Sequence, residues 1–386
     1  MSQTVTWTEN GEERTARWRS ESGAKPPRRV AVADDRTRAD AAYRLACEGT
    51  ALLWRGDYHG ARQLLAALAR RVDRKPPRPG ATPLETFHLY RQARSRRARV
   101  LGMLLVPLEA GPEGEWTVPL RRAPDVGAAC AQAYGPAAGA SGARSLVALR
   151  ELQGVIGAHE WHRGGVPVPA LGGDRVHPAY GVFSPVRGEY VDLVAGTPLP
   201  PAAGPAFDIG TGTGVLGAVL ARRGVARVVA TDQDPRALAC AEENVRLLGV
   251  DAAVEVVRAD LFPGAGEGRA RLAVCNPPWL PGKPGSPLEH AVYDPGSRML
   301  RGFLSGLRER LAPGGEGWLV LSDLAERIGL RSREELLGWI AGAGLEVAGR
   351  EDTRPRHARP ADESDPLHEA RCAEVTSLWR LRAPEA

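Results

Sequence analysis

The residues best suited to chemistry form the turn Asn276-Pro277-Pro278-Trp279, which directly follows the apolar run Leu272–Cys275. The Asn276 side chain offers a carbonyl acceptor, and Pro277 adds a backbone carbonyl that the two proline rings hold in place. Two such acceptors can converge on one NH₂ group, while the flat Trp279 ring can stack on a planar group. The turn predicts a site that orients an amide or aryl amine nitrogen, and the alternative is a strand-end turn with a surface tryptophan.

A second group of residues is suited to binding a ligand. An apolar run leads into a glycine-rich loop, and the segment reads Phe207-Asp208-Ile209-Gly210-Thr211-Gly212-Thr213-Gly214. Glycines allow the backbone to approach a ligand closely. Residues 212–217 alone match the dinucleotide pattern GxGxxG, but an acid before the first glycine would repel a pyrophosphate. Asp208 therefore favours a cationic ligand.

Two further acids come at the ends of apolar runs. Asp232 follows Val228–Thr231, where it could accept hydrogen bonds from both hydroxyls of a ribose. Asp260-Leu261 ends a third run, where it could bond an adenine amino group. Solvated caps at ordinary strand ends are the structural alternative for all of these acids.

From Pro205 onward, short apolar runs alternate with helical patterns, which is typical of a parallel sheet with helices on both faces. We expect strands at 206–209, 227–231, 253–258, 272–275, 317–321, 345–349 and 373–381. We expect helices at about 215–223, 235–248, 297–311 and 332–343. No helical pattern separates the last two strands, so the sheet should end in an antiparallel pair.

In this order the motifs resemble those of the class I S-adenosylmethionine-dependent methyltransferases, over about residues 177–386. The resemblance implies an α/β fold with a Rossmann-like, seven-stranded, mostly parallel sheet and a reversed final strand. It also implies S-adenosyl-L-methionine as the cofactor. The positions that it assigns to the cofactor are Asp208, Gly210, Thr211, Gly212, Gly214, Asp232, Asp260, Leu261 and Asn276.

The Asn-Pro-Pro-Trp turn resembles the NPP-aromatic motif of enzymes that methylate amide or exocyclic amine nitrogen. These include release-factor glutamine methyltransferases, adenine-N6 DNA enzymes and small-domain ribosomal RNA guanine-N2 methyltransferases. The catalytic residues that this resemblance implies are Asn276, Pro277, Pro278 and Trp279.

Two segments bear on the substrate. Residues 182–190 resemble the Pro-Arg-Pro-Glu segment of the release-factor enzymes, and residues 181–184 equally resemble the GVFS segment of the guanine enzymes. Residues 288–300 resemble a loop with a Tyr-acid-Pro element. The substrate-pocket candidates are Phe183, Ser184, Arg187, Glu189 and Tyr293; a surface ion pair is the alternative for Arg187 and Glu189.

We therefore expect an N-methyltransferase, with a protein glutamine side chain as the first acceptor. An RNA or DNA base amine comes second, and a small molecule or peptide third. A non-catalytic donor- or RNA-binding protein and a nicotinamide oxidoreductase are the alternatives from other classes.

Composition and charge bear on the partners and the cellular compartment of the protein. The 386 residues include 51 Lys and Arg against 46 Asp and Glu, and the first 120 residues hold 21 of these cations and 14 of these acids. Such a basic segment suits an anionic partner such as RNA, or reflects only an Arg-rich chain. Five scattered cysteines without a CxxC pair, and no long apolar run, predict a cytoplasmic protein with no structural metal and no membrane span.

The chain divides into four parts by pattern. We expect a mobile tail at 1–38, a small, mostly helical domain with its linker at 39–144, and a connecting helix and hairpin at 145–182. The methyltransferase domain should occupy 183–386.

Overall fold

The structure is a computed structural model that describes residues 3–137, 144–186, 188–201, 204–285, 287–356 and 362–384. The chain forms two compact units. The N-terminal unit consists of Met1–Arg78 and His88–Glu160, and the C-terminal unit consists of Pro79–Phe87 and Trp161–Ala386. Within these described ranges, no helix is long and apolar enough to cross a membrane.

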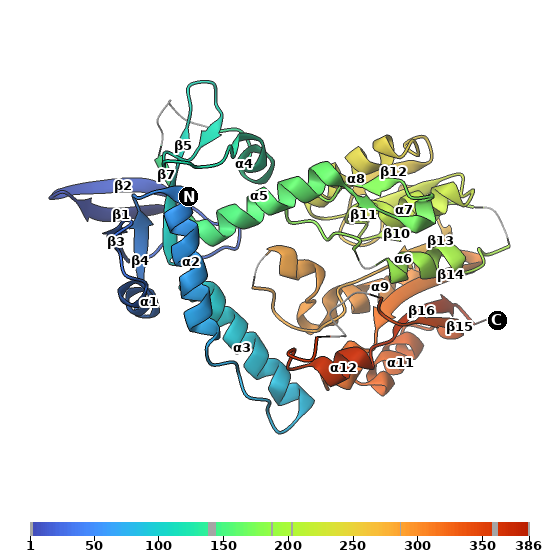
Figure 1. Cartoon of the computed structure of the whole chain (residues 1–386). Helices are drawn as coiled ribbons and strands as arrows, with labels where there is room; N and C mark the ends of the chain where they lie inside the picture. The colour runs from blue at the N-terminus through green and yellow to red at the C-terminus, as the bar shows by residue number, and fades with distance from the viewer. Residues whose placement is uncertain are drawn as a thin grey trace. The chain divides into compact units, whose positions relative to one another are not determined.

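The N-terminal unit is built on a twisted sheet whose strands follow the order β1-β2-β7-β5-β4-β3, with β6 also paired to β5 (Figure 1). Its strands are β1 (Thr4–Glu9), β2 (Glu12–Arg19), β3 (Arg29–Ala33), β4 (Thr50–Trp54), β5 (Leu104–Ala110), β6 (Trp116–Thr117) and β7 (Arg144–Ala148). The helices in this part of the chain are α1 (Ala39–Cys47), α2 (Tyr58–Asp73), α3 (Pro83–Leu101), α4 (Gly127–Tyr134) and α5 (Leu149–Gly164).

The expected mobile tail at 1–38 is wrong, because this segment holds β1, β2 and β3. Val5 and Trp7 are buried on one face of β1, while the threonines that alternate with them, Thr4, Thr6 and Thr8, are exposed. Asn10 and Gly11, both with positive φ (54° and 80°), connect β1 to its antiparallel partner β2. Asn-Gly between alternating strands is a strong hairpin signal, and the many charged residues on the exposed face concealed it.

The expectation of a mostly helical domain at 39–144 is also wrong. All five residues of β4 are buried, and such a short apolar run cannot be told from a buried helix by periodicity alone. Residues 144–148, expected to lie at the linker and the start of a connecting helix, form β7 between β2 and β5. The expected hairpin after α5 is present as β8 (Val166–Pro167) and β9 (Arg175–Val176).

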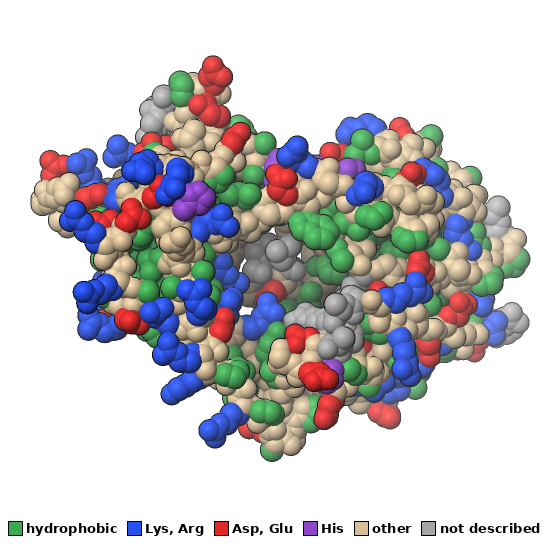
Figure 2. Space-filling view, in the orientation of Figure 1, with side chains coloured by type: hydrophobic (Ala, Val, Ile, Leu, Met, Phe, Trp, Pro, Cys, Tyr) green, Lys and Arg blue, Asp and Glu red, His purple; other side chains and the backbone are tan. Residues whose placement is uncertain are grey.

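Much of the positive charge of the chain is concentrated in and between α2 and α3. Residues 62–99 contain eleven Arg and Lys residues but only two acids, Asp73 and Glu85. In Figure 2, blue side chains gather over the part of the surface that carries these two helices in Figure 1. The region of α2 and α3 is therefore strongly basic.

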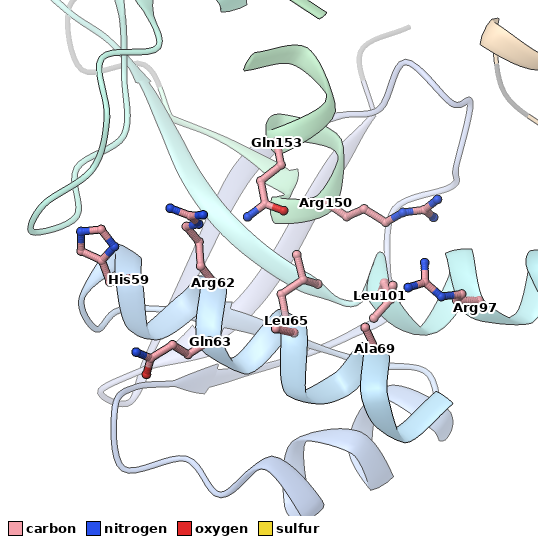
Figure 3. A pocket seen from close by; sticks show the side chains of 10 residues that line it. His59, Arg62, Gln63, Leu65, Ala69, Arg97, Leu101, Arg150 and Gln153 are labelled. Carbon is pink, nitrogen blue, oxygen red and sulfur yellow. The ribbon is translucent and has the colours of Figure 1, made fainter. Parts of the chain in front are cut away.

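A pocket of about 620 Å³ opens among α2, α3 and α5 of the same unit (Figure 3). Its lining residues are His59, Arg62, Gln63, Leu65, Ala66, Ala69, Arg97, Leu101, Arg150 and Gln153. The lining therefore combines cationic and amide side chains with an apolar floor.

The C-terminal unit confirms the predicted sheet. Its strands follow the order β12-β11-β10-β13-β14-β16-β15; the first five are parallel, and β16 is antiparallel to both of its neighbours. The strands are β10 (Ala206–Ile209), β11 (Val228–Asp232), β12 (Val254–Arg258), β13 (Ala270–Cys275), β14 (Leu311–Ser322), β15 (Glu346–Thr353) and β16 (Thr376–Arg382).

Helices cover both faces of this sheet, as expected for parallel strands. They are α6 (Glu189–Gly196), α7 (Val215–Arg222), α8 (Pro235–Leu247), α9 (Arg298–Arg310), α10 (Leu324–Arg327), α11 (Arg333–Gly342) and α12 (His368–Cys372). Alternate strand residues point to opposite faces: Ala206 packs in the cluster with α6, α7 and α8, whereas Phe207 packs in the cluster with α9 and α11.

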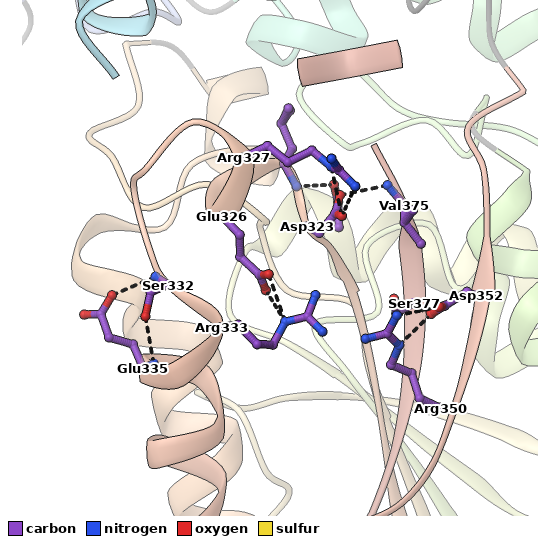
Figure 4. A network of polar contacts seen from close by, with 12 residues as sticks. Asp323, Glu326, Arg327, Ser332, Arg333, Glu335, Arg350, Asp352, Val375 and Ser377 are labelled. Carbon is purple, nitrogen blue, oxygen red and sulfur yellow. Dashed lines mark hydrogen bonds and ion pairs between the residues drawn. The ribbon is translucent and has the colours of Figure 1, made fainter. Parts of the chain in front are cut away.

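A polar network stabilises the carboxyl end of β14 and the antiparallel strands beside it (Figure 4). Asp323 accepts hydrogen bonds from Arg327 at 2.9 Å and from the backbone N–H of Val375 at 2.8 Å. On α11, Ser332 and Glu335 form a reciprocal capping box, which fixes where the helix begins. These contacts link the segment after β14 to the start of β16 and fix the start of α11.

We expect the contact between α9 and β14 to be a main source of stability in this unit. Leu307 is fully buried, and a Cβ on Gly317 of β14 would collide with its side chain. Leu307→Ala should lower the free energy of unfolding in urea by about 2–5 kcal/mol. Leu337→Ala, at a 41% exposed position on α11, is the control and should change it by less than about 0.5 kcal/mol. Equal effects of the two substitutions would contradict this packing.

Candidate functional site

Three neighbouring parallel strands bring the predicted site residues to one edge of the sheet. Ile209, the last residue of β10, pairs with Thr231 of β11 on one side and with Cys275 of β13 on the other. Because parallel strands that end in register leave the sheet together, the residues that follow them lie at the same edge. Gly210 and Asn276 follow β10 and β13, and Asp232 is the last residue of β11.

The glycine loop between β10 and α7 turns back tightly at this edge. Gly210, Gly212 and Gly214 all have positive φ (73°, 56° and 81°), a conformation that other residues rarely adopt. The carbonyl of Thr231 accepts the N–H groups of both Gly210 and Thr211, at 2.9 and 2.8 Å. A Cβ placed on Gly212 would meet no described atom within 4 Å. The loop thus presents its backbone to an open space that a ligand can enter.

Asp208 is the buried acid beneath this loop. One carboxylate oxygen, Oδ2, accepts hydrogen bonds from Thr211 Oγ1 at 2.6 Å and from the N–H of Gly217 at 2.9 Å. The other, Oδ1, is buried and has no hydrogen-bond partner within the described part of the chain. Burial, with a smaller contribution from Asp232, raises the pKa of Asp208 to about 6. Asp208 therefore shapes the loop and keeps one acceptor unsatisfied.

Two substrate-pocket candidates add further unsatisfied oxygens. Glu189 begins α6 and is buried, and neither its Oε1 nor the Oγ of Ser184 has a hydrogen-bond partner among the described residues. Burial raises the pKa of Tyr190, and the charges of Asp208 and Glu189 raise it further. Each of these buried oxygens could accept a hydrogen bond from a cationic or donor-rich ligand that reached it.

Asp232 lies where the ribose acid was predicted. Its Oδ2 accepts the N–H of Gly212 at 3.1 Å, and its Oδ1 accepts the N–H of Asp234 at 3.0 Å. Burial raises the pKa of this carboxyl as well. Since each carboxylate oxygen can accept more than one hydrogen bond, Asp232 keeps acceptor capacity for a pair of hydroxyl groups.

The third acid, Asp260, is more exposed and forms an ion pair with Arg298 at the start of α9. The following residue, Leu261, has a positive φ of 72°, and its carbonyl accepts the hydroxyl of Thr231 at 2.5 Å. This hydrogen bond ties the segment after β12 to β11. Sequence reasoning missed Thr231 and Arg298, because a strand threonine and a helical arginine give no signal by themselves.

The Asn-Pro-Pro-Trp turn is held by a hydrogen bond that the sequence analysis did not anticipate. The indole Nε1 of Trp279 donates to Asn276 Oδ1 at 2.8 Å. Trp279 is half-buried and packs against the hydrophobic clusters on both faces of the sheet, so its ring is only partly exposed at the surface. Pro277, which lies between Asn276 and Trp279 in the sequence, is buried. The turn therefore fixes the direction of the Asn276 carbonyl, which retains a second lone pair.

The segment after the turn closes back on it. Leu280 and Tyr293 form a parallel β-bridge, with the Leu280 N–H donating to the Val292 carbonyl at 3.1 Å and the Leu280 carbonyl accepting the Asp294 N–H at 2.9 Å. Tyr293 is thus brought next to the residue that follows Trp279. Asp294 caps α9 by accepting the N–H of Met299 at 2.9 Å.

Two substrate-pocket candidates remain, Phe183 and Arg187. Phe183 packs against the cluster that contains α6 and α7. Arg187 lies outside the described residues, so its predicted role stays a prediction. Within the described ranges, no group of three or more His, Cys, Asp and Glu side chains is arranged to hold a metal ion.

Comparison with known proteins agrees with this geometry. Residues 175–327 match the family model described as Methyltransferase small domain. A release factor glutamine methyltransferase of Deinococcus radiodurans is 35% identical over 156 residues, which cover 38% of this chain and 55% of that protein. The corresponding protein of Cereibacter sphaeroides is 33% identical over 151 residues, covering 36% and 51%. A ribosomal protein L11 methyltransferase of Heliobacterium modesticaldum is 50% identical over 70 residues, covering 18% and 22%.

The chain spans about half the length of the release-factor relatives, and about a fifth of the L11 methyltransferase. The family match falls within the C-terminal unit and includes the loop, the strand-end acids and the Asn-Pro-Pro-Trp turn. Sequence, sheet topology and family match agree: the C-terminal unit is a class I S-adenosylmethionine-dependent methyltransferase domain.

Proposed function

We propose that this protein transfers a methyl group from S-adenosylmethionine to the side-chain amide nitrogen of a protein glutamine. The observation that carries the proposal is the Trp279–Asn276 hydrogen bond, because it fixes an amide carbonyl beside the glycine loop. The release factor glutamine methyltransferases at 33% and 35% identity support the choice of acceptor.

The residues present fit the donor. When bound, S-adenosylmethionine supplies an electrophilic methyl group on a positively charged sulfur. Asp208 and Glu189 are buried acids with unsatisfied oxygens, and they favour a cation over a phosphate. Asp232 offers its carboxylate to the ribose hydroxyls, and the open space over Gly212 lets the ligand approach the backbone.

The turn forms the part of the site that binds the methyl-accepting substrate. A primary amide has two N–H donors, and the Asn276 side chain and the Pro277 carbonyl are two acceptors held at one strand end. Hydrogen bonds to both protons would orient the nitrogen and increase its electron density. Because these acceptors are already fixed in the free protein, orientation costs little when the substrate binds.

The acceptor class can be tested directly. Cell extract from a strain that lacks this protein should be incubated with the purified protein and S-adenosylmethionine labelled in the methyl group. We expect the label in the protein fraction and, after proteolysis, on a glutamine side chain. Label in RNA, DNA or small molecules alone would instead favour a base amine or a small acceptor and would overturn the proposed substrate. Extract without added protein is the control.

Loss of the Asn276 carbonyl should affect transfer far more than donor binding. Asn276→Ala should lower kcat at least about a hundredfold, as for removal of an orienting group, with donor Kd by calorimetry changed less than about twofold. Trp279→Phe keeps a ring but removes the indole N–H, so its kcat should fall about tenfold. If Asn276→Ala retained normal turnover, the proposed role of the turn would be wrong.

The raised pKa of Asp208 predicts two opposite pH dependences. Protonation below about pH 6 removes the charge that favours a cationic donor, so donor affinity should fall as pH decreases from 7.5 to 5. The free energy of unfolding of the ligand-free protein should have the opposite dependence, with the contribution of Asp208 rising as the pH decreases. Because the folded pKa exceeds the unfolded value of about 3.9, the contribution of Asp208 is most favourable below about pH 4 and is lost as pH rises through about 6.

Asp208→Asn is the matched variant, and it should remove both of these dependences. Calorimetry with S-adenosylmethionine and urea unfolding, each at several pH values, measure them. A donor affinity that varied identically with pH in both proteins would show that Asp208 does not act on the ligand.

A further inference from the structure

The pocket among α2, α3 and α5 lies within the N-terminal unit and takes no part in the site described above. Its volume of about 620 Å³ falls in the range of small-ligand sites. Leu65 and Leu101 are buried in the unit and form part of the floor, together with Ala66 and Ala69. An apolar floor of this kind accepts a flat ring.

The polar lining carries positive charge and hydrogen-bond donors but no carboxylate. Arg62, Arg97 and Arg150 contribute guanidinium groups from α2, α3 and α5 respectively. In Figure 3, Arg62 and Gln153 extend toward one another from α2 and α5, and Arg97 and Arg150 lie at the other end of the pocket. Arginines at the two ends of the pocket can therefore face several linked anions.

Several of these groups are available to a ligand. The side chains of Arg62, Gln63 and Gln153 make no hydrogen bond or ion pair in the part of the chain that the structure describes. Arg97 uses its Nε to bond Asp73 at 2.9 Å, which leaves its terminal nitrogens as donors. The pocket thus has donors for phosphate oxygens and amides for polar ring edges.

The surroundings favour a polyanion over an isolated anion. Eleven cations and two acids occupy residues 62–99, and the N-terminal unit as a whole has 25 Lys and Arg against 16 Asp and Glu. The C-terminal unit has 26 against 30, so the positive field belongs to the N-terminal unit. A strand of linked phosphates uses such an extended field, whereas a single nucleotide would need only the pocket.

We propose that the N-terminal unit binds single-stranded RNA, with one base on the apolar floor of this pocket and the neighbouring phosphates on Arg62, Arg97 and Arg150. A base must be unstacked to enter a concave site, which favours a single strand over a duplex. An acidic protein segment would satisfy the arginines, but it would fill the floor with a ring only where an aromatic side chain stands beside its acids. This RNA site is separate from the methyl-transfer site and does not depend on the proposed acceptor.

The test is binding of a fluorescein-labelled, twelve-nucleotide single-stranded RNA to the full chain, followed by anisotropy at several KCl concentrations. Ala66→Trp fills the pocket from an exposed position without changing charge, and it should weaken binding at least about tenfold while leaving the salt dependence unchanged. The double variant Arg62→Gln/Arg150→Gln should weaken binding and lower the slope of log K against log [KCl] by about 1.4, which is ~0.7 for each lost phosphate contact.

The charge-matched control is Arg36→Gln/Arg38→Gln, at two exposed positions of the same unit that do not line the pocket. It should change RNA affinity by less than about threefold. The proposed site would be wrong if Ala66→Trp bound RNA as tightly as the unchanged protein. It would also be wrong if the two charge variants lost equal RNA affinity, because that result indicates non-specific attraction to the surface. Polyglutamate that competes as well as unlabelled RNA would show an acidic protein ligand instead. Binding is measured without S-adenosylmethionine, so these results do not depend on methyl transfer.

Discussion

The parallel pairing of β10 with β11 and β13 is the constraint on which the methyltransferase site depends. The three strands end within one residue of each other, so the glycine loop, Asp232 and the Asn-Pro-Pro-Trp turn all lie at a common edge. A shift of one residue in either pairing would reverse the faces of a strand and bury its apolar residues on the wrong side. The hydrophobic clusters on the two faces therefore maintain the positions of the site residues.

Burial is the physical feature that makes the loop selective. Asp208 could be ionised at little cost in water, but at this depth it needs hydrogen bonds or a nearby cation. Thr211 and Gly217 satisfy one of its oxygens only. In the proposed donor site, the oxygen without a partner among the described residues would favour a cation over an anion, and this would distinguish the loop from dinucleotide-binding loops of similar glycine spacing. The same burial explains why the pKa of Asp208 is raised.

The sequence was sufficient to predict the C-terminal unit because its signals are local and consistent. Glycines, strand-end acids and the Asn-Pro-Pro turn each require a specific backbone conformation, and the alternation of elements leaves few possible topologies. The N-terminal unit was predicted wrongly because its strands β4 and β7 are short and are identified only by the strands beside them. The Trp279–Asn276 hydrogen bond was missed for a related reason: residue types show that a donor and an acceptor are present, but not that they face each other.

The difference in charge between the two units agrees with the ligand proposed for each of them. The donor site needs unneutralised carboxylates, and guanidinium groups nearby would pair with Asp208 and Glu189 and remove their preference for a cation. A surface for RNA needs the reverse, since acids among the arginines would weaken its attraction for phosphate. One compact unit cannot easily meet both requirements. Placing the arginines of α2 and α3 on a separate folded unit allows the chain to hold a basic surface and an acidic donor site at the same time.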